Sequence, residues 1–211
     1  WWGPEFIQLY NEAYRKVLGA KHPRAMGQPF AQCWKEIFHI VGPMADVPYR
    51  GGPASVSDDL GLLIDRNLPQ EEAHFRLAYS PVPDETVPGT GVGGVLATVT
   101  EITEQVFAER QLRTLRELSA RSAAAAGSAQ EACTAAALTL ASNALDVPFA
   151  MFYLRDAQGS LQLAAQSLSA SGHSGWPGNL VGDVREVSVV PIKAAVHAPA
   201  SPWGYAPEAA I

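Results

Sequence analysis

Charge is scarce in this chain, because only 17% of its 211 residues are charged and the net charge is −6. No run of Lys and Arg occurs, so we expect no nucleic-acid partner. No apolar run reaches the roughly 18 residues that a bilayer-spanning helix requires, so we expect no membrane insertion. No signal peptide is visible, and the cysteine usage fits a reducing compartment, so we expect a cytoplasmic protein. A first residue of Trp1 rather than Met indicates an excised fragment.

Cysteine is also scarce, since Cys33 and Cys133 are the only two. They lie far apart and form no C-x-x-C pair, so neither a zinc cage nor a disulfide framework is predicted. What the chain does contain is apolar residues, at 47%, together with 18 glycines and 16 prolines. This composition predicts a globular chain that is rich in turns and has one large core or two modest ones.

Helical and extended patterns follow one another in the first fifty residues. A strand is predicted over Phe6–Tyr10, followed by a short helix that Asn11 caps and Gly19 ends. A second helix is predicted over residues 29–44, ended by Gly42 and Pro43. Its buried stripe would consist of Phe30, Trp34, Ile37, Phe38 and Val41.

Three β segments come next, at residues 60–65, 73–82 and 92–100. In the middle segment Phe75, Leu77 and Tyr79 alternate with the polar residues His74, Arg76 and Ser80, which predicts one buried and one solvated face. We read the neighbouring acidic pairs as surface charge, because adjacency in sequence does not make two carboxylates converge. These pairs are Asp58–Asp59 and Glu71–Glu72.

The glycines between the last two strands match a nucleotide-binding spacing. Gly89, Gly91 and Gly94 fit G-x-G-x-x-G. A dinucleotide fingerprint follows a strand and opens a helix, whose amides hold the pyrophosphate. Here the glycines precede a strand rich in Val and Thr, so the order is reversed. We therefore predict a hairpin loop that binds neither NAD nor ATP.

After this strand the pattern changes to helical spacing over residues 104–121. Its apolar stripe is narrow, and the remaining positions are polar or charged. Such a helix suits the seam of a two-chain coiled coil, with Leu112 and Leu115 facing the partner chain. Packing of the helix on its own domain is an equal alternative. The stripe consists of Ile102, Val106, Leu112, Leu115 and Leu118.

A second unit is predicted over residues 122–211. An Ala- and Leu-rich helix runs to Leu145, and two strands, 149–154 and 161–167, flank a turn at Asp156–Gly159. Two further strand-like pieces occur at 185–196 and 208–211.

These features together resemble a PAS domain over residues 1–103. The stretch LYNEAYRKVLG looks like the opening of that family, and Glu101-Ile102-Thr103 matches its closing acidic-aliphatic-Thr triad. The resemblance implies an α+β fold, in which an antiparallel sheet with flanking helices passes into a connecting signalling helix over 104–121. The triad would relay the signal. We expect Ile102 to be buried, Thr103 to cap the helix, and Glu101 to bind a basic partner that the sequence does not identify.

Residues 122–211 resemble the N-terminal part of a GAF domain: a long helix, a strand, an Asp-x-x-Gly turn and a strand. The final WGYAPEAAI looks like the approach to a central GAF strand. The opening of the chain is similar to PAS domains at the front of bacterial sensor histidine kinases. The resemblance therefore implies a sensory, dimerising input module whose parent protein is a histidine kinase. The alternative is a ligand-binding or interaction module that controls a phosphatase or a cyclic-nucleotide enzyme.

Catalytic and cofactor chemistry is not indicated within the chain itself. None of its five histidines lies in a phosphoacceptor motif, so we expect no catalysis. Cys33 lacks the Asn-Cys-Arg-Phe motif of flavin photosensors and His39 stands alone, so neither flavin nor haem is expected. Two roles are open for four aromatic residues: they line a cavity for an unidentified small molecule, or they fill the core. We favour the filled core. These are Trp34, Phe38, Phe75 and Tyr79.

Overall fold

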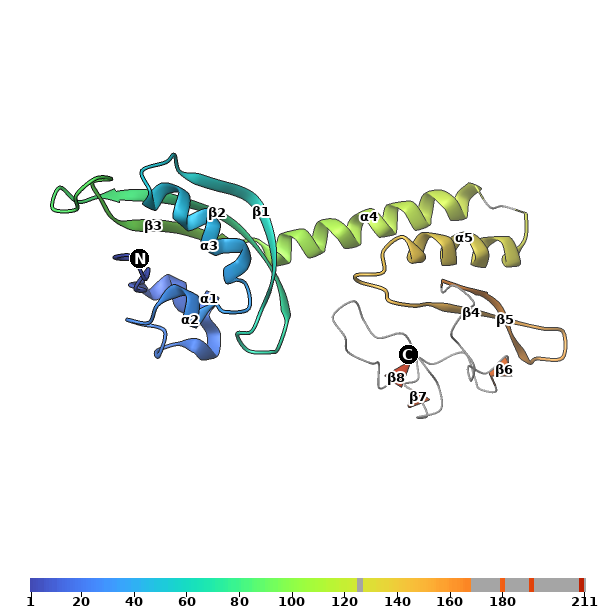
Figure 1. Cartoon of the computed structure of the whole chain (residues 1–211). Coiled ribbons are helices and arrows are strands. Elements are labelled where there is room, and N and C mark those ends of the chain that lie inside the picture. The colour runs from blue at the N-terminus through green and yellow to red at the C-terminus, as the bar shows by residue number, and fades with distance from the viewer. Residues whose placement is uncertain (125–126, 168–178, 181–189, 192–208, 211) are drawn as a thin grey trace. The chain divides into compact units, whose positions relative to one another are not determined.

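The computed structural model describes residues 1–124, 127–167, 179–180, 190–191 and 209–210 (Figure 1). The fold is α+β, with antiparallel sheets and flanking helices. The chain divides into two compact units, Trp1–Phe107 and Ala108–Ile211, which we call unit 1 and unit 2. Sequence reasoning assigned 1–103, 104–121 and 122–211, and the observed division falls within the helix assigned to the connection.

The sheet of unit 1 has three antiparallel strands in the order β1-β2-β3. They span Ser55–Ile64, Glu71–Pro83 and Val92–Glu101, which makes the first longer than the sequence predicted. The alternation predicted for β2 is confirmed, because Phe75, Leu77 and Tyr79 are all buried. The register places Phe75 opposite both Leu60 and Glu101, so the end of β3 lies beside the middle of the sheet.

The glycine run forms the predicted hairpin loop between β2 and β3. Gly89 and Gly91 have φ values of +86° and +63°, which side chains other than glycine rarely adopt. The Asp84 amide donates to the Gly91 carbonyl at 2.7 Å and closes the loop. Gly94 is needed for a close approach instead of a turn, because a Cβ there would stand 2.9 Å from the Trp2 ring.

Short helices cover the inner face of this sheet (Figure 1). The first three are η1 (Glu12–Tyr14), α1 (Arg15–Leu18) and η2 (Gly19–Lys21). As predicted, Asn11 caps η1 by accepting from the Tyr14 amide, and Gly19 ends α1 with a φ of +52°. The predicted strand at Phe6–Tyr10 is wrong as a continuous element. It is reduced to bridges, among them Ile7 with Trp2 and with Pro29.

The single helix predicted over residues 29–44 is wrong. The segment divides into α2 (Phe30–Cys33) and α3 (Phe38–Tyr49), and Pro43 lies inside α3 instead of ending it. The break between them coincides with Glu36, whose carboxylate accepts from the Asp65 amide and from Lys21. Packing favours the continued helix, since Val41, Gly42, Ala45 and Pro48 are all buried against the rest of the unit.

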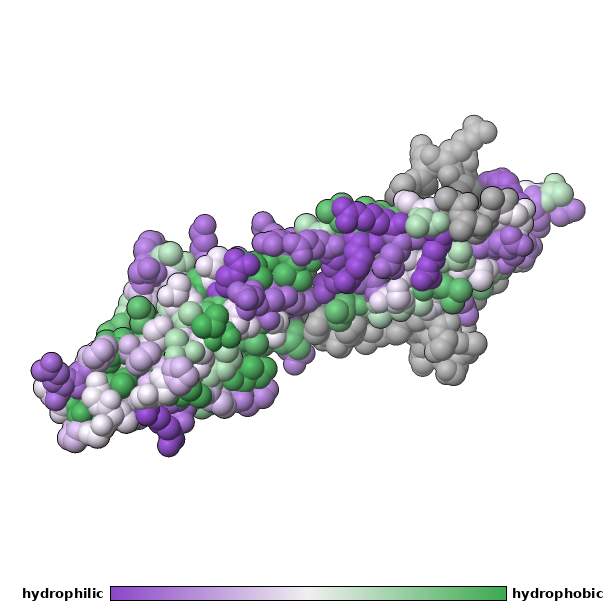
Figure 2. Space-filling model, turned by 90° about the horizontal axis from the view of Figure 1, so that it is seen from above, coloured by the Kyte–Doolittle hydropathy of each residue, from purple (hydrophilic) through white to green (hydrophobic). Residues whose placement is uncertain are grey.

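The core of unit 1 lies between these helices and the sheet. Trp1 extends it, because its ring stacks on Phe30 with centroids 4.0 Å apart and meets Tyr79 edge-on at 4.9 Å. The largest fully buried side chains of the unit are Trp34, Phe30, Leu18, Ile64, Gln8, Val41, Val95 and Pro48. Figure 2 shows that the apolar surface seen from above is broken into patches between hydrophilic side chains.

Unit 2 contains most of helix α4, which spans Thr103–Ala124 and begins in unit 1. Helix α5 (Ala129–Ala141) starts at the cap Ser128 and packs on β4 (Met151–Arg155) and β5 (Leu161–Gln166). As predicted, the strands flank a turn, in which the Gly159 amide donates to the Asp156 carbonyl at 3.0 Å. The helix predicted to reach Leu145 ends at Ala141.

The remaining strands of unit 2 are short. β6 (Asn179–Leu180) joins the β4–β5 sheet, and β7 (Val190–Pro191) pairs with β8 (Ala209–Ala210). The strands predicted at 185–196 and 208–211 lie outside the described residues, apart from these pairs. Within the described part of the chain, no helix is both long and apolar enough to cross a bilayer.

Candidate functional site

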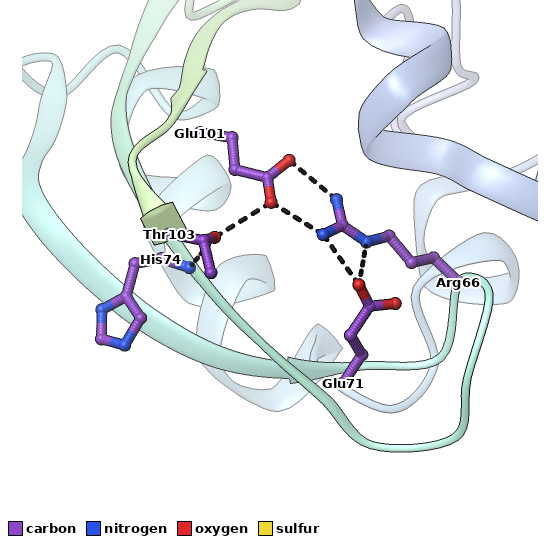
Figure 3. Close-up of polar contacts among 5 residues, drawn as sticks. All are labelled: Arg66, Glu71, His74, Glu101 and Thr103. Atoms are coloured by element: carbon purple, nitrogen blue, oxygen red, sulfur yellow. Dashed lines mark hydrogen bonds and ion pairs between the residues drawn. The ribbon is translucent and has the colours of Figure 1, made fainter. Parts of the chain in front are cut away.

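The end of β3 carries the most elaborate polar cluster of unit 1 (Figure 3). Arg66, in the turn between β1 and β2, donates from Nη1 and Nη2 to the two carboxylate oxygens of Glu101, each at 2.7 Å. Its Nε donates to Glu71 Oε1 at 3.0 Å. The expected basic partner of Glu101 is therefore Arg66. We call these residues, together with Thr103 and His74, the junction cluster.

Burial makes this pair stronger than an exposed ion pair. Only 10% of the Arg66 side chain is exposed, against 27% for Glu101. The hydrogen bonds from Arg66 hold the pKa of Glu101 below its usual range, and the Thr103 hydroxyl lowers it further. A planar guanidinium that holds two carboxylates in a fork fixes direction as well as distance. The last residue of β3 is therefore held in one orientation.

Thr103 links this pair to the middle strand. Its hydroxyl donates to Glu101 Oε1 at 2.9 Å and accepts from the His74 amide at 3.0 Å. The Ile102 amide donates to the His74 carbonyl at 2.8 Å, so both backbone groups of His74 hold the start of α4. The junction cluster thereby connects β2, the end of β3 and the first turn of α4.

The expected cap at Thr103 differs from the observed geometry. Thr103 is the first residue of the helix and is buried, whereas Ile102 is only half-buried. The Ile102 carbonyl accepts the amide of Val106 at 3.0 Å, which puts Ile102 at the capping position. The Thr103 hydroxyl accepts from a strand amide, because the register of β2 places His74 beside it.

His74 corrects a second expectation. Its ring is not solvated, since 14% of the side chain is exposed, and its two nitrogens contact Asp59 at 2.7 Å and Glu72 at 3.1 Å. Burial lowers the pKa of His74, but these carboxylates outweigh it and the pKa is raised above its ordinary value. The ring also meets Phe107 of α4 edge-on, with centroids 6.3 Å apart.

The acidic pairs beside the strands are likewise more than surface charge. Glu71 binds Arg66, while Asp59 and Glu72 bind His74. Asp58 alone matches the expectation, with a side chain that is 92% exposed. The carboxylates converge across the sheet because neighbouring strands bring them together, a proximity that spacing along the chain does not reveal.

A small cavity of about 30 Å³ lies between the helices and the sheet of unit 1. Trp34, Phe75 and Tyr79 line it, whereas Phe38 does not. A cavity of this size accommodates a water molecule or two, far short of the roughly 300–1,000 Å³ typical of small-molecule sites. Phe38 is half-buried and covers Gly42, where a Cβ would stand 2.9 Å from its ring.

Polar atoms are present around this cavity. Trp34 Nε1 is buried and has no hydrogen-bond partner among the described residues. Burial raises the pKa of the Tyr79 phenol, and burial together with Tyr79 and Cys33 raises that of Tyr14. Both phenols therefore remain neutral donors, and they suit a water or a small polar group better than an anion.

The two seam leucines lie on an exposed face of α4. Leu112 is 50% and Leu115 is 59% exposed. The other side of the same helix is occupied within unit 2, where Arg110 pairs with Asp146 at 2.5 Å and Thr114 accepts from Asn143 at 2.8 Å. Packing on its own domain thus uses a face of α4 that does not include the two leucines.

The two residues considered for cofactor binding differ in exposure. Cys33 is buried, which raises the pKa of its thiol, and His39 is exposed at the surface of α3. No group of three or more His, Cys, Asp or Glu side chains in the described part of the chain is arranged to hold a metal ion.

Sequence reasoning singled out Glu101 and Thr103 but missed Arg66. Arg66 is 35 residues from Glu101 and lies in an ordinary turn sequence, so no local signal marks it. No family model matches the chain, and no curated protein matches it either.

Proposed function

We propose that this chain is the sensory and dimerising input module of a bacterial signal-transduction protein, with a sensor histidine kinase as its parent. Unit 1 would act as the PAS-like sensor, and unit 2 as the start of a GAF-like domain. The observation that carries the proposal is the junction cluster, in which Arg66 holds Glu101 at the point where β3 passes into α4.

The mechanism uses α4 as the output element. Glu101, Ile102 and Thr103 bond the start of the helix to Arg66 and to the backbone of His74. A ligand or partner that shifts the sheet of unit 1 would move these anchors together, because the pair and the hydroxyl share one carboxylate oxygen. The helix would then change its rotation or register, given two packings of nearly equal free energy.

A seam on α4 would carry this change across a homodimer. Ala108, Leu112, Leu115 and Ser119 follow the 4-3-4 spacing of a two-chain seam, and all four are exposed. The two leucines supply its apolar centre, while the small residues flank it. A rotation of each helix would therefore change which side chains meet between the two copies.

The test joins the C-terminus of the full chain to a histidine-kinase core and measures autophosphorylation. Arg66→Ala should shift the activity several-fold in either direction, because the start of α4 loses its anchor. The matched control is Arg76→Ala, since Arg76 is exposed and lies 3.8 Å from Asp58. Equal activity of the wild-type and Arg66→Ala fusions, with both folded, would overturn the proposed coupling.

A further inference from the structure

The ring of His74 is enclosed where the sheet of unit 1 meets α4. Only 14% of the side chain is exposed. Gly61, opposite His74 in the β1–β2 register, leaves room for the ring, because a Cβ there would stand 3.1 Å from its Cε1 atom. Phe107 of α4 meets the ring edge-on, with centroids 6.3 Å apart. A movement of the ring therefore changes its contact with the helix.

Both ring nitrogens of His74 face a carboxylate. Nδ1 lies 2.7 Å from Asp59, and Nε2 lies 3.1 Å from Glu72. A neutral imidazole has one nitrogen that donates and one that accepts, whereas an ionised carboxylate only accepts. The two contacts form together when both nitrogens carry a proton, so this arrangement selects the positively charged ring. Burial lowers the pKa of His74, but the two carboxylates outweigh it and the pKa is raised.

The other charged groups on the elements around the ring are paired or exposed. They come from the strands on either side, from the β1–β2 turn and from the residues of α4 one turn away from Phe107. The pairs are Arg76 with Asp58, Arg66 with Glu71 and Glu101, and Arg110 with Asp146, and the exposed side chain is Glu104. Asp59 and Glu72 are therefore the charges that the ring meets directly.

On the basis of the sensory function proposed above, we propose that the signal sensed by unit 1 is a change of pH, and that the His74 ring is the site that binds the proton. At low pH the charged ring is held between Asp59 and Glu72. As the pH rises, the ring loses a proton, and one nitrogen becomes an acceptor that repels the carboxylate beside it. The contact with Asp59 breaks, because that side chain is 52% exposed and is readily hydrated, whereas Glu72 is 13% exposed.

Loss of this contact reaches α4 by two routes. Asp59 lies in the register shift of β1, where the backbone ladder to β2 is interrupted, so its side-chain contact helps to fix this part of the strand. The His74 amide donates to Thr103 (Figure 3), and the His74 carbonyl accepts from Ile102. A turn of the released ring changes the contact with Phe107 beside these two anchors. The start of the helix therefore has one set of contacts when His74 is charged and another when it is neutral.

The first measurement follows the ring protons of His74 in the full chain by NMR between pH ~5.5 and ~8.5, assigned by their loss in His74→Gln. We expect a midpoint above ~6.5. Asp59→Asn should lower this midpoint, because the charged ring loses one of its two carboxylates. The matched control is Asp58→Asn, which removes the same charge one residue away at a side chain that is 92% exposed, and it should lower the midpoint far less.

The second measurement uses the fusion of the full chain to a histidine-kinase core. At each pH the autophosphorylation of the wild type is divided by that of His74→Gln, so that the pH dependence of the core itself cancels. We expect this ratio to change several-fold, with the midpoint that NMR gives for His74. Asp59→Asn should move both midpoints together, a match that a role of His74 in folding alone does not produce.

Two outcomes would overturn the proposal: a midpoint of His74 that Asp59→Asn leaves unchanged, or an activity ratio that stays constant while the ring titrates. The proposed function fails by a different result, equal activity of the wild-type and Arg66→Ala fusions at every pH. A constant ratio together with an effect of Arg66→Ala therefore keeps the sensory module and removes the proton as its signal.

Discussion

Arg66 is the single side chain on which the junction cluster depends. Replacing it with Ala leaves Glu71 and Glu101 close together without a counter-charge. Because Arg66 is 10% exposed and the two glutamates are about a quarter exposed, we expect a loss of about 2–3 kcal/mol in the free energy of unfolding of unit 1. Urea denaturation measures this loss.

Arg76→Ala is the matched control for this prediction, since Arg76 is 57% exposed and should cost less than about 0.5 kcal/mol. Arg66→Lys separates charge from geometry, because an ammonium cannot reproduce the two-pronged contact. If Arg66→Ala were no more destabilising than the control, the ion pair would contribute nothing to the start of α4.

His74 predicts a dependence of stability on pH. Its folded pKa is raised above the unfolded value of about 6.5, because Asp59 and Glu72 outweigh burial. The stabilisation is therefore complete below pH ~6.5 and is lost as the pH rises through the folded pKa. The difference in unfolding free energy between the wild type and His74→Gln should shrink steadily above pH ~6.5. A difference between the wild type and His74→Gln that stays constant across this pH range would remove His74 as the titrating group.

Residue roles were predictable where the signal was local. The cap at Asn11 follows from its side chain, and the helix end at Gly19 from the backbone freedom of glycine. The buried face of β2 follows from the alternation of Phe75, Leu77 and Tyr79 with polar residues. The partners of Glu101 and His74 were not predictable, because they come from other strands and depend on register. A polar residue on a strand is solvated or buried according to what the next strand places beside it.

At the scale of elements, β3 depends on Gly93 and Gly94, where a Cβ would crowd the Trp2 ring. A Cβ on Gly94 would meet the Trp1 carbonyl and approach the Trp2 ring to 2.9 Å. Gly94→Val should displace Trp1–Gly3 from β3 and cost about 1–3 kcal/mol. A lower melting temperature together with a red shift of tryptophan emission would report this. Thr98→Val, at an exposed position of the same strand, should leave both unchanged, and a Gly94→Val protein as stable as that control would contradict the close approach.

Elements were predicted well where the hydrophobic period agreed with the turn and capping residues at their ends, as in the three strands of unit 1 and in α4. They were predicted poorly where a proline was taken as a helix end. Pro43 continues α3 because the buried face of the helix includes Gly42 and Ala45, and that packing outweighs one missing backbone hydrogen bond. The strand predicted at Phe6–Tyr10 was wrong because tertiary pairing is missing. Its residues favour a strand, but only single bridges pair with them.

At the scale of the whole molecule, the proposed contact between copies is the seam of α4. It can be removed without touching the junction cluster, because Leu112 and Leu115 belong to the later part of α4. Signalling of the proposed kind requires this seam, because rotation of α4 changes a contact only where two such helices meet.

The last prediction therefore concerns the seam. Leu112→Glu with Leu115→Glu places four carboxylates in an apolar contact of two copies, and exposed apolar area of this kind contributes about 25 cal/mol per Å² when buried. We expect the dissociation constant of the helix-mediated dimer to rise at least tenfold, while unit 1 keeps its melting temperature because both leucines lie outside it. The matched control, Gln111→Glu with Ala120→Glu, adds the same charge at exposed positions off the seam and should leave association unchanged. Analytical ultracentrifugation of the two variants and the wild type measures this difference. If the leucine variant still dimerises as the control does, α4 is not the seam, and the relay through Glu101, Ile102 and Thr103 has no paired helix to act on.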